Sequence, residues 1–441
     1  MAAPGRGKAH FCKGPVTATC KYIKVMKDTP FYNAAYARKL DAENELSKFR
    51  SRFHIPEGKV YMDGNSLGLL SIDAEKSLLR VLDEWKALGI GGWMDAEIPW
   101  FRYAEEMGAR ASVLFGAAAD EVVFTGTTTI NIHTLAGSFY KPSAKRKKIL
   151  ADELNFPSDL YALQGQLKIR GIDPEENLIL VKADQQGLLD EDEIISHMTG
   201  EVALVLLPSV LYRSGQLLDI ARIAGAAKER NIPAGFDCSH SAGVVPHRFD
   251  EWGVDFALWC SYKYMNAGPG AAAFLYVNKK HFGLDPSLPG WFGSDKERQF
   301  DMLPKFIPAA GAGRWQISSP GILGSSPLEG ALNITLEAGI ENIRKVSLQL
   351  TNFLDGLIRQ TIMPFHPECR IITPREPARR GGHIAVEHPL AEKIYGKLTE
   401  SGIITDLRPP NIIRIAPVPL YNTFEEVLHT ADTLGTILRN I

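Results

Sequence analysis

The chain has 441 residues, of which 45% are hydrophobic and 23% are charged, and its mean hydropathy is −0.09. These values are ordinary for globular proteins and exclude disordered, collagen-like and coiled-coil classes. The formal net charge of −2 lacks the basic excess of nucleic-acid-binding proteins, and no apolar stretch approaches the roughly 18 residues of a membrane-spanning helix. We therefore expect neither a nucleic-acid nor a membrane partner, and the length predicts two or three domains.

Five cysteines lie at positions 12, 20, 238, 260 and 369. Their odd number and the absence of a C-x-x-C pair argue against a disulfide framework and against a zinc site. We therefore expect no metal site, and a reducing compartment, the cytoplasm, as the location.

Residues 1–27 differ in composition from the rest, with six basic residues and no acidic residue. Serine is absent and lysine outnumbers arginine, which argues against an organelle transit peptide, although that alternative stays open. We expect residues 1–30 to form a disordered tail.

Helical patterns come first in the folded part. Residues 73–88 place Leu78, Leu79, Leu82 and Trp85 on one helical face, and 102–115 is the next helix. A third helix is predicted over 158–170, with Ser158 as its N-cap after a proline.

Short apolar runs then alternate with helical segments such as 219–230. The predicted strands are 148–151, 178–181, 202–207, 233–236, 256–260 and 271–277. This alternation predicts an α/β fold with a mainly parallel sheet covered by helices.

The composition changes near residues 304–327, which are rich in Pro, Gly and Ser and have no strong hydrophobic periodicity. Beyond them we predict helices over 341–360, 390–401 and 424–439 and strands over 371–373, 382–386 and 412–416. We therefore divide the chain into an N-terminal segment that packs on the small domain (31–70), a large cofactor-binding domain (71–325) and a small C-terminal α+β domain (326–441).

The densest chemical signal is a carboxylate and a lysine that each follow a predicted strand. Asp237 lies in the segment 236–240 (FDCSH), and Lys263 lies in the segment 259–264 (WCSYKY) before a glycine-rich turn. Pyridoxal phosphate chemistry needs both groups, a Schiff-base lysine and a carboxylate on the pyridine nitrogen. Alone, Lys263 is typical of a surface lysine and Asp237 of a turn residue, but their joint placement favours the cofactor.

Anchors for a phosphate are also present. The segment 125–129 (TGTTT) enters a helical pattern over 130–140, so its N–H groups and hydroxyls can face an anion, although an ordinary capping turn is the alternative. Ser209 and Tyr262 offer further hydroxyls. Phe156 can stack on a planar ring, although a phenylalanine in a loop is more often a core residue.

Several segments together resemble one enzyme family, the kynureninases. The matching segments are 63–68 (DGNSLG), 155–159 (NFPSD), 236–241 (FDCSHS), 252–257 (WGVDFA), 259–268 (WCSYKYMNAG), 290–293 (GWFG) and 413–422 (IRIAPVPLYN). They run in family order across about residues 45–441. Related enzymes such as cysteine desulfurases lack the SYKY and APVPLYN segments.

The resemblance implies a pyridoxal-phosphate-dependent transferase fold of type I, with a seven-stranded, mainly parallel sheet in the large domain. It implies a homodimer with shared active sites that hydrolyses L-kynurenine or 3-hydroxykynurenine to L-alanine and an anthranilate. Such a reaction belongs to tryptophan catabolism or to NAD biosynthesis.

The resemblance also assigns roles to residues of this sequence. Lys263 binds the cofactor covalently and moves the α-proton, Asp237 pairs with the pyridinium, and Tyr262 protonates the β-carbon. The remaining cofactor positions are Thr128, Thr129, Ser209 and Tyr262 on the phosphate side, Phe156 over the ring with Asp159 nearby, His240 beside it, and Trp291 and Ser319 from the neighbouring subunit. Arg414 matches the ligand of the substrate α-carboxylate, and Ser66 matches a residue on the aryl side.

One residue departs from the family pattern. Ser319 stands where Asn or Thr is expected, which leaves the preference between kynurenine and its 3-hydroxy form open. Two alternatives remain: another enzyme of the same fold, such as a desulfurase or epimerase, and a catalytically silent relative. Cys369 has no Gly/Ser-rich loop of the kind a desulfurase needs, and the joint presence of Lys263, Asp237 and Arg414 argues against a silent protein.

Overall fold

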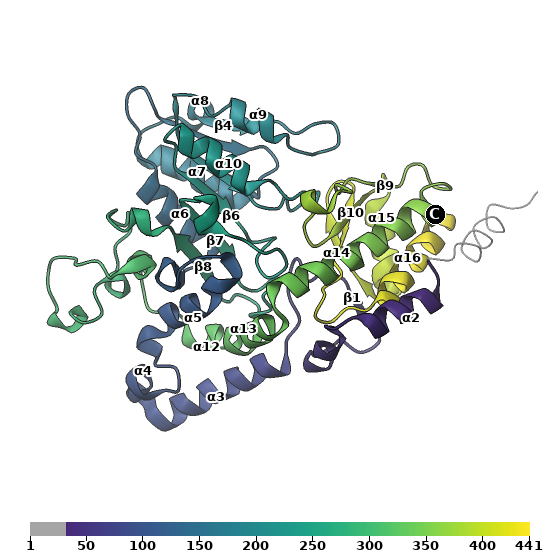
Figure 1. The fold of residues 1–441 in the computed structure, drawn as a ribbon, viewed down its shortest axis with the longest axis horizontal. Helices are drawn as coiled ribbons and strands as arrows, with labels where there is room; N and C mark the ends of the chain where they lie inside the picture. Colours follow the sequence, from purple (N-terminus) through teal and green to yellow (C-terminus); the bar gives the residue numbers. More distant parts are fainter. Residues whose placement is uncertain (1–31) are drawn as a thin grey trace, which may run out of the picture.

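The computed structural model describes residues 32–441, so the tail predicted over residues 1–30 lies outside the described residues. Figure 1 shows a larger lobe around one sheet and a smaller lobe beside it, with the long helix α14 (Ile340–Leu357) running from one to the other. Among residues 32–441, no helix has both the length and the apolar content to cross a bilayer.

A seven-stranded sheet forms the centre of the larger lobe. Its order is β2 (Val122–Phe124), β8 (Ala273–Val277), β7 (Phe256–Cys260), β6 (Ala234–Asp237), β5 (Val202–Pro208), β3 (Lys148–Asp152) and β4 (Leu178–Val181). Only β8 runs against its neighbours, and the other pairings are parallel. The predicted α/β fold with a mainly parallel sheet is therefore confirmed, and β2 is the strand that the sequence pattern missed.

The sheet is covered on both faces, which explains the uninterrupted apolar runs of its strands. Alternate residues of β5 belong to different packed clusters: Leu204 contributes to one and Val205 to the other. Helices α6 (Thr128–Phe139) and α7 (Pro157–Ile169) pack on the first face. Helices α5 (Tyr103–Ser112) and α10 (Ile220–Glu229) pack on the second.

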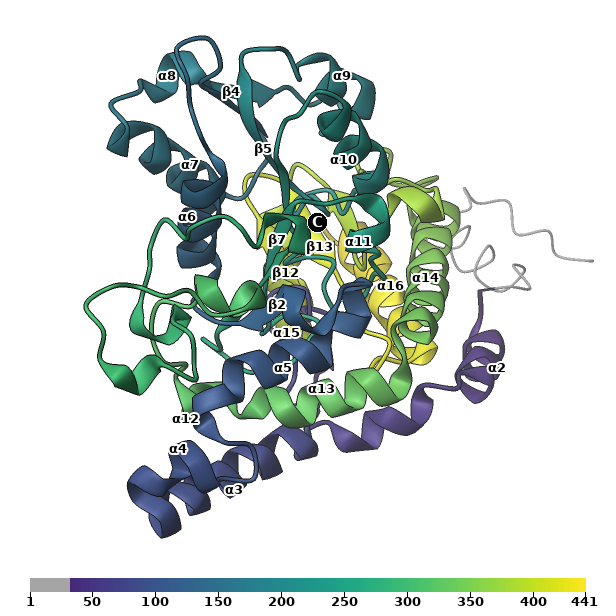
Figure 2. The same ribbon diagram turned by 60° about the vertical axis from the view of Figure 1, so that its left-hand side comes forward.

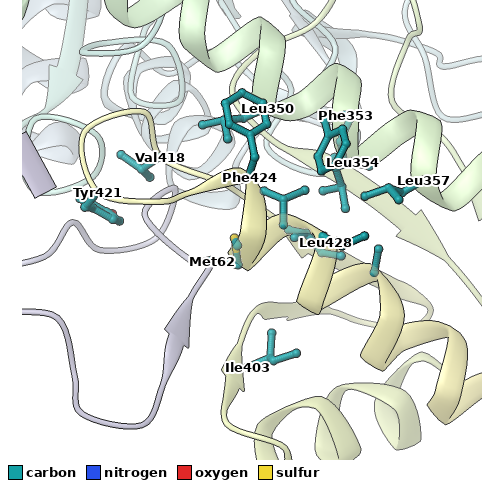
Figure 3. Packing of buried hydrophobic residues seen from close by; sticks show 14 of the residues in the cluster. Met62, Leu350, Phe353, Leu354, Leu357, Ile403, Val418, Tyr421, Phe424 and Leu428 are labelled. Atoms are coloured by element: carbon teal, nitrogen blue, oxygen red, sulfur yellow. The ribbon is translucent and has the colours of Figure 1, made fainter. Parts of the chain in front are cut away.

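The smaller lobe contains a four-stranded antiparallel sheet. Its order is β12 (Asp406–Arg408), β13 (Ile412–Ile415), β10 (Ile384–Glu387) and β9 (Arg370–Ile371). Figure 3 shows how Leu350 and Leu354 of α14 meet Phe424 and Leu428 of α16 (Phe424–Arg439) in its core.

The N-terminal segment adds to this core. Strand β1 (Val60–Tyr61) pairs in parallel with β11 (Ile403–Ile404), and α2 (Ala34–Glu43) lies along α16 (Figure 1). Helix α13 (Pro327–Ala338) supplies Leu328 to the core of the larger lobe and Ile334 to that of the smaller one. The boundary placed at residue 326 therefore stays a prediction.

The remaining helices connect these layers. They are α3 (Ile72–Leu88), α4 (Gly92–Asp95), α8 (Pro174–Asn177), α9 (Glu191–Ser196), α11 (Phe249–Trp252), α12 (Ile322–Ser325) and α15 (Ala391–Glu400). Figure 2 shows α13 lying along α3.

One local prediction was wrong. Ser158 does not cap α7, because Pro157 takes the first helical position and Phe156 the N-cap; proline fits there since its missing N–H has no partner in the first turn. The helix predicted over 73–88 is confirmed as α3, but its apolar face is not buried within the chain: Ala74 and Val81 are the buried residues of the helix, while Leu79 and Trp85 are more than half exposed.

Candidate active site

A cavity of about 370 Å³ opens where the central strands end. Its lining residues are Asn65, Ser66, Thr128, Thr129, Phe156, Ser158, Asp237, Ser239, His240, Tyr262, Lys263 and Arg408. Asp237 ends β6 and Lys263 follows β7, and the carboxyl ends of neighbouring parallel strands meet at one edge of the sheet. The structure thus brings eight of the predicted site residues to one cavity.

Lys263 presents its amine to an imidazole. The Lys263 Nζ lies 2.9 Å from Nε2 of His240 and 6.0 Å from the centre of the Phe156 ring. Burial, reinforced by the charge of Lys263, holds the pKa of His240 well below its ordinary value. The imidazole is therefore neutral and can accept a hydrogen bond from the lysine amine.

Two carboxyl groups interact at this site, and only that of Asp237 lines the cavity. The Oδ1 of Asp237 accepts the backbone N–H of Ser239 at 2.7 Å. Asp159, on the first turn of α7, is buried and does not line the cavity. Burial and the neighbouring charge of Asp237 raise the pKa of Asp159 well above its ordinary value, so Asp159 keeps its proton and Asp237 carries the negative charge of the pair.

The N-terminus of α6 faces the cavity as an anion cradle. Thr127 is the N-cap, but its side chain accepts no capping hydrogen bond, and Thr128 and Thr129 line the cavity. Gly126 has a φ of 60°, and a Cβ there would lie 2.5 Å from Oδ1 of Asn131. The turn therefore needs glycine, and the free N–H groups of the first helical turn suit a phosphate.

Ser209 lies behind this cradle rather than in it. Its side chain is fully buried, its Oγ lies 2.6 Å from Oγ of Ser241, and it does not line the cavity. Tyr262 does line the cavity, and burial raises the pKa of its phenol above the ordinary value. The phenol therefore keeps its proton.

Arg414, which the sequence predicts to bind the substrate, does not line the cavity but contacts a residue that does. Arg414 is fully buried; it pairs with Asp406 and donates to the carbonyl of Tyr212 at 2.8 Å and to Oγ of Ser66 at 3.0 Å. The two predicted substrate-binding residues, Ser66 and Arg414, are thus in contact, and only Ser66 lines the cavity.

Arg408 is a cavity residue that sequence reasoning missed. Its Nε lies 2.8 Å from Asp406, and its guanidinium lies 5.8 Å from the centre of the Tyr212 ring. The signal that could have found it is the second arginine in the segment 406–414, six residues before Arg414.

Trp291 and Ser319 lie outside the cavity. Both line a second, apolar groove of about 490 Å³ together with Trp93, Phe292 and other hydrophobic residues. Within this chain, therefore, the structure does not bring these two residues to Lys263.

Taken together, these groups fit pyridoxal phosphate. An amine stands between a phosphate cradle and a buried carboxylate, and Phe156 offers a ring face. One polar atom of a cavity residue, Nδ1 of His240, is buried without a hydrogen-bond partner. In the part of the chain that the structure describes, no group of three or more His, Cys, Asp or Glu side chains is placed to hold a metal ion.

Asp152, at the end of β3, is a further buried acid near this site. Both of its carboxyl oxygens lack a hydrogen-bond partner, and burial raises its pKa from 3.8 to about 7. Because the folded chain then binds the proton more tightly than the unfolded chain, stability falls as the pH rises from about 4 to about 7.

We expect Asp152→Asn to remove this pH dependence. Relative to the parent, the free energy of unfolding of the cofactor-free variant should rise by roughly 2–4 kcal/mol between pH 5 and pH 8, as urea denaturation at both pH values would measure. Asp83→Asn, at an exposed acid, is the control. An equal pH response of parent and Asp152→Asn would contradict the prediction.

Comparison with known proteins identifies close relatives. The kynureninase of Geobacillus thermodenitrificans (strain NG80-2) is 53% identical over 404 residues, which cover 92% of this chain and 94% of that protein. The kynureninase of Shouchella clausii (strain KSM-K16) is 52% identical over 408 residues, covering 92% and 95%. The family pattern of the kynureninase C-terminal domain matches residues 343–434.

Solved structures show the same fold in more distant proteins. The apo cysteine desulfurase of Thermococcus onnurineus NA1 matches with a TM-score of 0.76 and 17% identity, covering 90% of this chain and 98% of that chain. A variant of C-DES with glycine covalently linked to its pyridoxal-phosphate cofactor matches with a TM-score of 0.75 and 20% identity, covering 88% and 98%.

Proposed function

This chain belongs to the kynureninase family, and from that premise we propose that it is a pyridoxal-phosphate enzyme that hydrolyses L-kynurenine, 3-hydroxykynurenine or both. The products are L-alanine and the corresponding anthranilate. The observation that carries the proposal is the amine of Lys263 at 2.9 Å from a neutral imidazole, in one cavity with the carboxylate of Asp237.

The bound cofactor supplies an electron sink that stabilises negative charge on the α- and β-carbons of the substrate. Lys263 holds it covalently and moves the α-proton, with the neutral imidazole of His240 as the hydrogen-bond acceptor beside its amine. Asp237 keeps the ring nitrogen protonated, because the proton on Asp159 leaves the charge of the acid pair on Asp237. Thr128 and Thr129 hold the phosphate at the N-terminus of α6.

The substrate-facing groups divide the remaining tasks. The guanidinium of Arg414, which is paired with Asp406, binds the α-carboxylate of the substrate. For this, the hydroxyl of Ser66 either moves away from Arg414 or shares the hydrogen bond with the substrate. Tyr262, whose phenol keeps its proton, donates that proton to the β-carbon after the carbon–carbon bond breaks. Water supplies the oxygen that turns the ketone carbon into the anthranilate carboxyl group.

We further propose a homodimer in which Trp291 and Ser319 complete the site of the second copy. Exposed apolar side chains gather beside these residues, among them Trp85, Ile90, Met94, Phe300 and Leu323. They belong to α3, the turn η2 (Gly89–Gly91), α4, α12 and the segment 291–300, and the three helices lie together at the lower edge of the larger lobe in Figure 1. A patch of this extent is typical of a protein interface, and it also accounts for the exposed stripe of α3.

Steady-state kinetics with kynurenine and with 3-hydroxykynurenine test the function. We expect one equivalent of alanine and one of anthranilate or 3-hydroxyanthranilate per turnover, identified by chromatography. Release of sulfide from cysteine without any anthranilate would instead indicate a desulfurase. The ratio of kcat/KM for the two kynurenines would show which of them the protein prefers.

A cytoplasmic location is part of the proposal. The three cysteines of the described residues, Cys238, Cys260 and Cys369, are all buried free thiols, as expected in a reducing compartment.

We expect Ser319→Asn to shift the ratio of kcat/KM for 3-hydroxykynurenine over kynurenine roughly 3- to 30-fold toward the hydroxylated substrate. The range corresponds to one hydrogen bond of about 0.6–2 kcal/mol gained in a confined site, because an amide reaches further than a hydroxyl. The measurement is the pair of kcat/KM values for each protein at saturating cofactor. Equal ratios would mean that Ser319 acts only in the turn before Pro320.

A further inference from the structure

Lys296 is a buried lysine that the proposed chemistry does not use. The residue follows the short helix η7 (Trp291–Gly293) in the chain. Its side chain is 5% exposed, and its Nζ makes no hydrogen bond. The Nζ lies 4.1 Å from the ring centre of Phe292 and 4.7 Å from that of Phe101, and 3.6 Å from Oε1 of Glu105 on α5. Because desolvating an ammonium is costly, its burial between two rings and a carboxylate calls for a reason.

The same carboxylate also holds a second segment. Oε1 of Glu105 accepts a hydrogen bond of 2.6 Å from Nε2 of Gln316, three residues before Ser319. Phe292, on which Lys296 rests, directly follows Trp291. One ion pair, between the buried Lys296 and the half-buried Glu105, therefore joins α5 to both segments that carry the residues facing the apolar groove.

The two segments also lie backbone against backbone. A Cβ on Gly290 would lie 1.9 Å from the carbonyl oxygen of Ile317, and a Cβ on Gly293 would lie 2.5 Å from that of Gln316. Such approaches exclude a side chain, so the register between the two segments is fixed. Any shift of one segment would carry the other with it.

We propose that the Lys296–Glu105 pair is a positioning device that acts in trans, by fixing the segments that present Trp291 and Ser319 to the cofactor site of the second copy. This inference rests on the shared-site dimer proposed above. Such a role accounts for keeping an ion pair with a buried lysine where two apolar side chains of similar size would be at least as stable.

Lys296→Met tests the proposal without using activity. The dissociation constant of pyridoxal phosphate, from absorbance titration of the cofactor-free protein, should rise roughly 10-fold or more, since small misplacements of positioning groups have effects of this size or larger. When Glu105→Gln is added to Lys296→Met, so that neither charge of the pair is left alone, the midpoint of thermal unfolding should stay equal or rise. Glu105→Gln, which keeps the size of the side chain but removes its charge, should weaken cofactor binding in the same direction.

The matched control is Glu297→Gln. The exposed pair of Arg102 and Glu297, 2.6 Å apart, joins the start of α5 to the same loop. Because exposed pairs contribute little, cofactor affinity should change less than about 2-fold. Unchanged cofactor affinity in Lys296→Met, or a loss of affinity in the double variant that only follows a loss of thermal stability, would overturn the proposal.

Subunit mixing distinguishes action in trans from action within one chain. In a hybrid dimer of one Lys263→Ala subunit and one Lys296→Met subunit, one of the two sites is intact. Its Lys263 comes from the Lys296→Met subunit, and the intact Lys296–Glu105 pair beside it comes from the Lys263→Ala subunit. At a cofactor concentration that saturates the parent but not Lys296→Met, an equal mixture should recover about a quarter of the parent activity, because half of the dimers are hybrids with one good site.

A parallel mixture of Lys263→Ala with Trp291→Ala tests the shared site itself. Recovery of activity in that mixture but not in the mixture with Lys296→Met would overturn the positioning role of the Lys296–Glu105 pair and would still support the shared-site dimer. Absence of recovery in both mixtures would refute the shared site and this inference with it, while the kynureninase activity of the unmixed parent reports on the proposed reaction independently.

Discussion

Replacing Lys263 with alanine is expected to lower kcat by at least about 10⁴-fold, the upper end of what a single general acid–base group contributes. The loss should be this large because the proposed mechanism uses one amine both to hold the cofactor and to move the α-proton. His240 cannot substitute, because burial holds the pKa of its imidazole well below the ordinary value and it has no bond to the cofactor. Stopped-time assays of anthranilate release would measure the effect.

Two controls separate this loss from misfolding. The thermal midpoint of cofactor-free Lys263→Ala should match that of the parent, and added small amines should restore part of the activity by replacing the proton carrier. Borohydride treatment of the loaded parent should fix the cofactor on the peptide that contains Lys263, as mass spectrometry would show. Activity above a small fraction of the parent without added amine would refute the role of Lys263.

The sequence could place the main parts of the site because its signals are local. Asp237 and Lys263 each follow an apolar run, and parallel strands bring the groups after their carboxyl ends to one edge. The bounds of β7 (Phe256–Cys260) and α16 (Phe424–Arg439) agree with the predicted ranges, and a capping box at Thr423 and Glu426 marks the start of α16.

What the sequence could not show depends on which side chains meet in three dimensions. Asp159 and Asp237 are 78 positions apart, and only their contact in the fold determines which of them keeps the proton. In the same way, Arg408 reaches the cavity while Arg414 is fully buried behind Ser66, although both lie on one short antiparallel pair of strands.

The stripe on α3 is instructive because the pattern was correct and its interpretation was incomplete. Apolar periodicity predicts a face that packs, but it does not say whether the same chain or a second copy covers that face. Trp85 is 55% exposed in this chain and lines a groove with Trp93 and Ser319, and in the dimer proposed above the second copy covers it. Periodicity alone could not have separated these two cases.

Asp237→Asn is expected to lower kcat by about 10²-fold or more while changing KM less than about 3-fold. An amide can neither carry the negative charge nor keep a ring nitrogen protonated, so the loss falls on the chemical step rather than on substrate binding. The side chain itself should stay in place, because its Oδ1 accepts the backbone N–H of Ser239 at 2.7 Å and the amide oxygen of asparagine can accept the same bond. Steady-state kinetics at saturating cofactor would give both constants.

Asp159→Asn is the matched comparison, because it alters the neighbouring acid without removing the charge from Asp237. Burial and the charge of Asp237 raise the pKa of Asp159 well above its ordinary value, so the parent already holds a neutral group at that position. A neutral amide there should therefore lower kcat much less than Asp237→Asn does. If instead Asp237→Asn left kcat unchanged and Asp159→Asn abolished turnover, the charge that serves the ring nitrogen would reside on Asp159, and the assignment of the two acids would have to be exchanged.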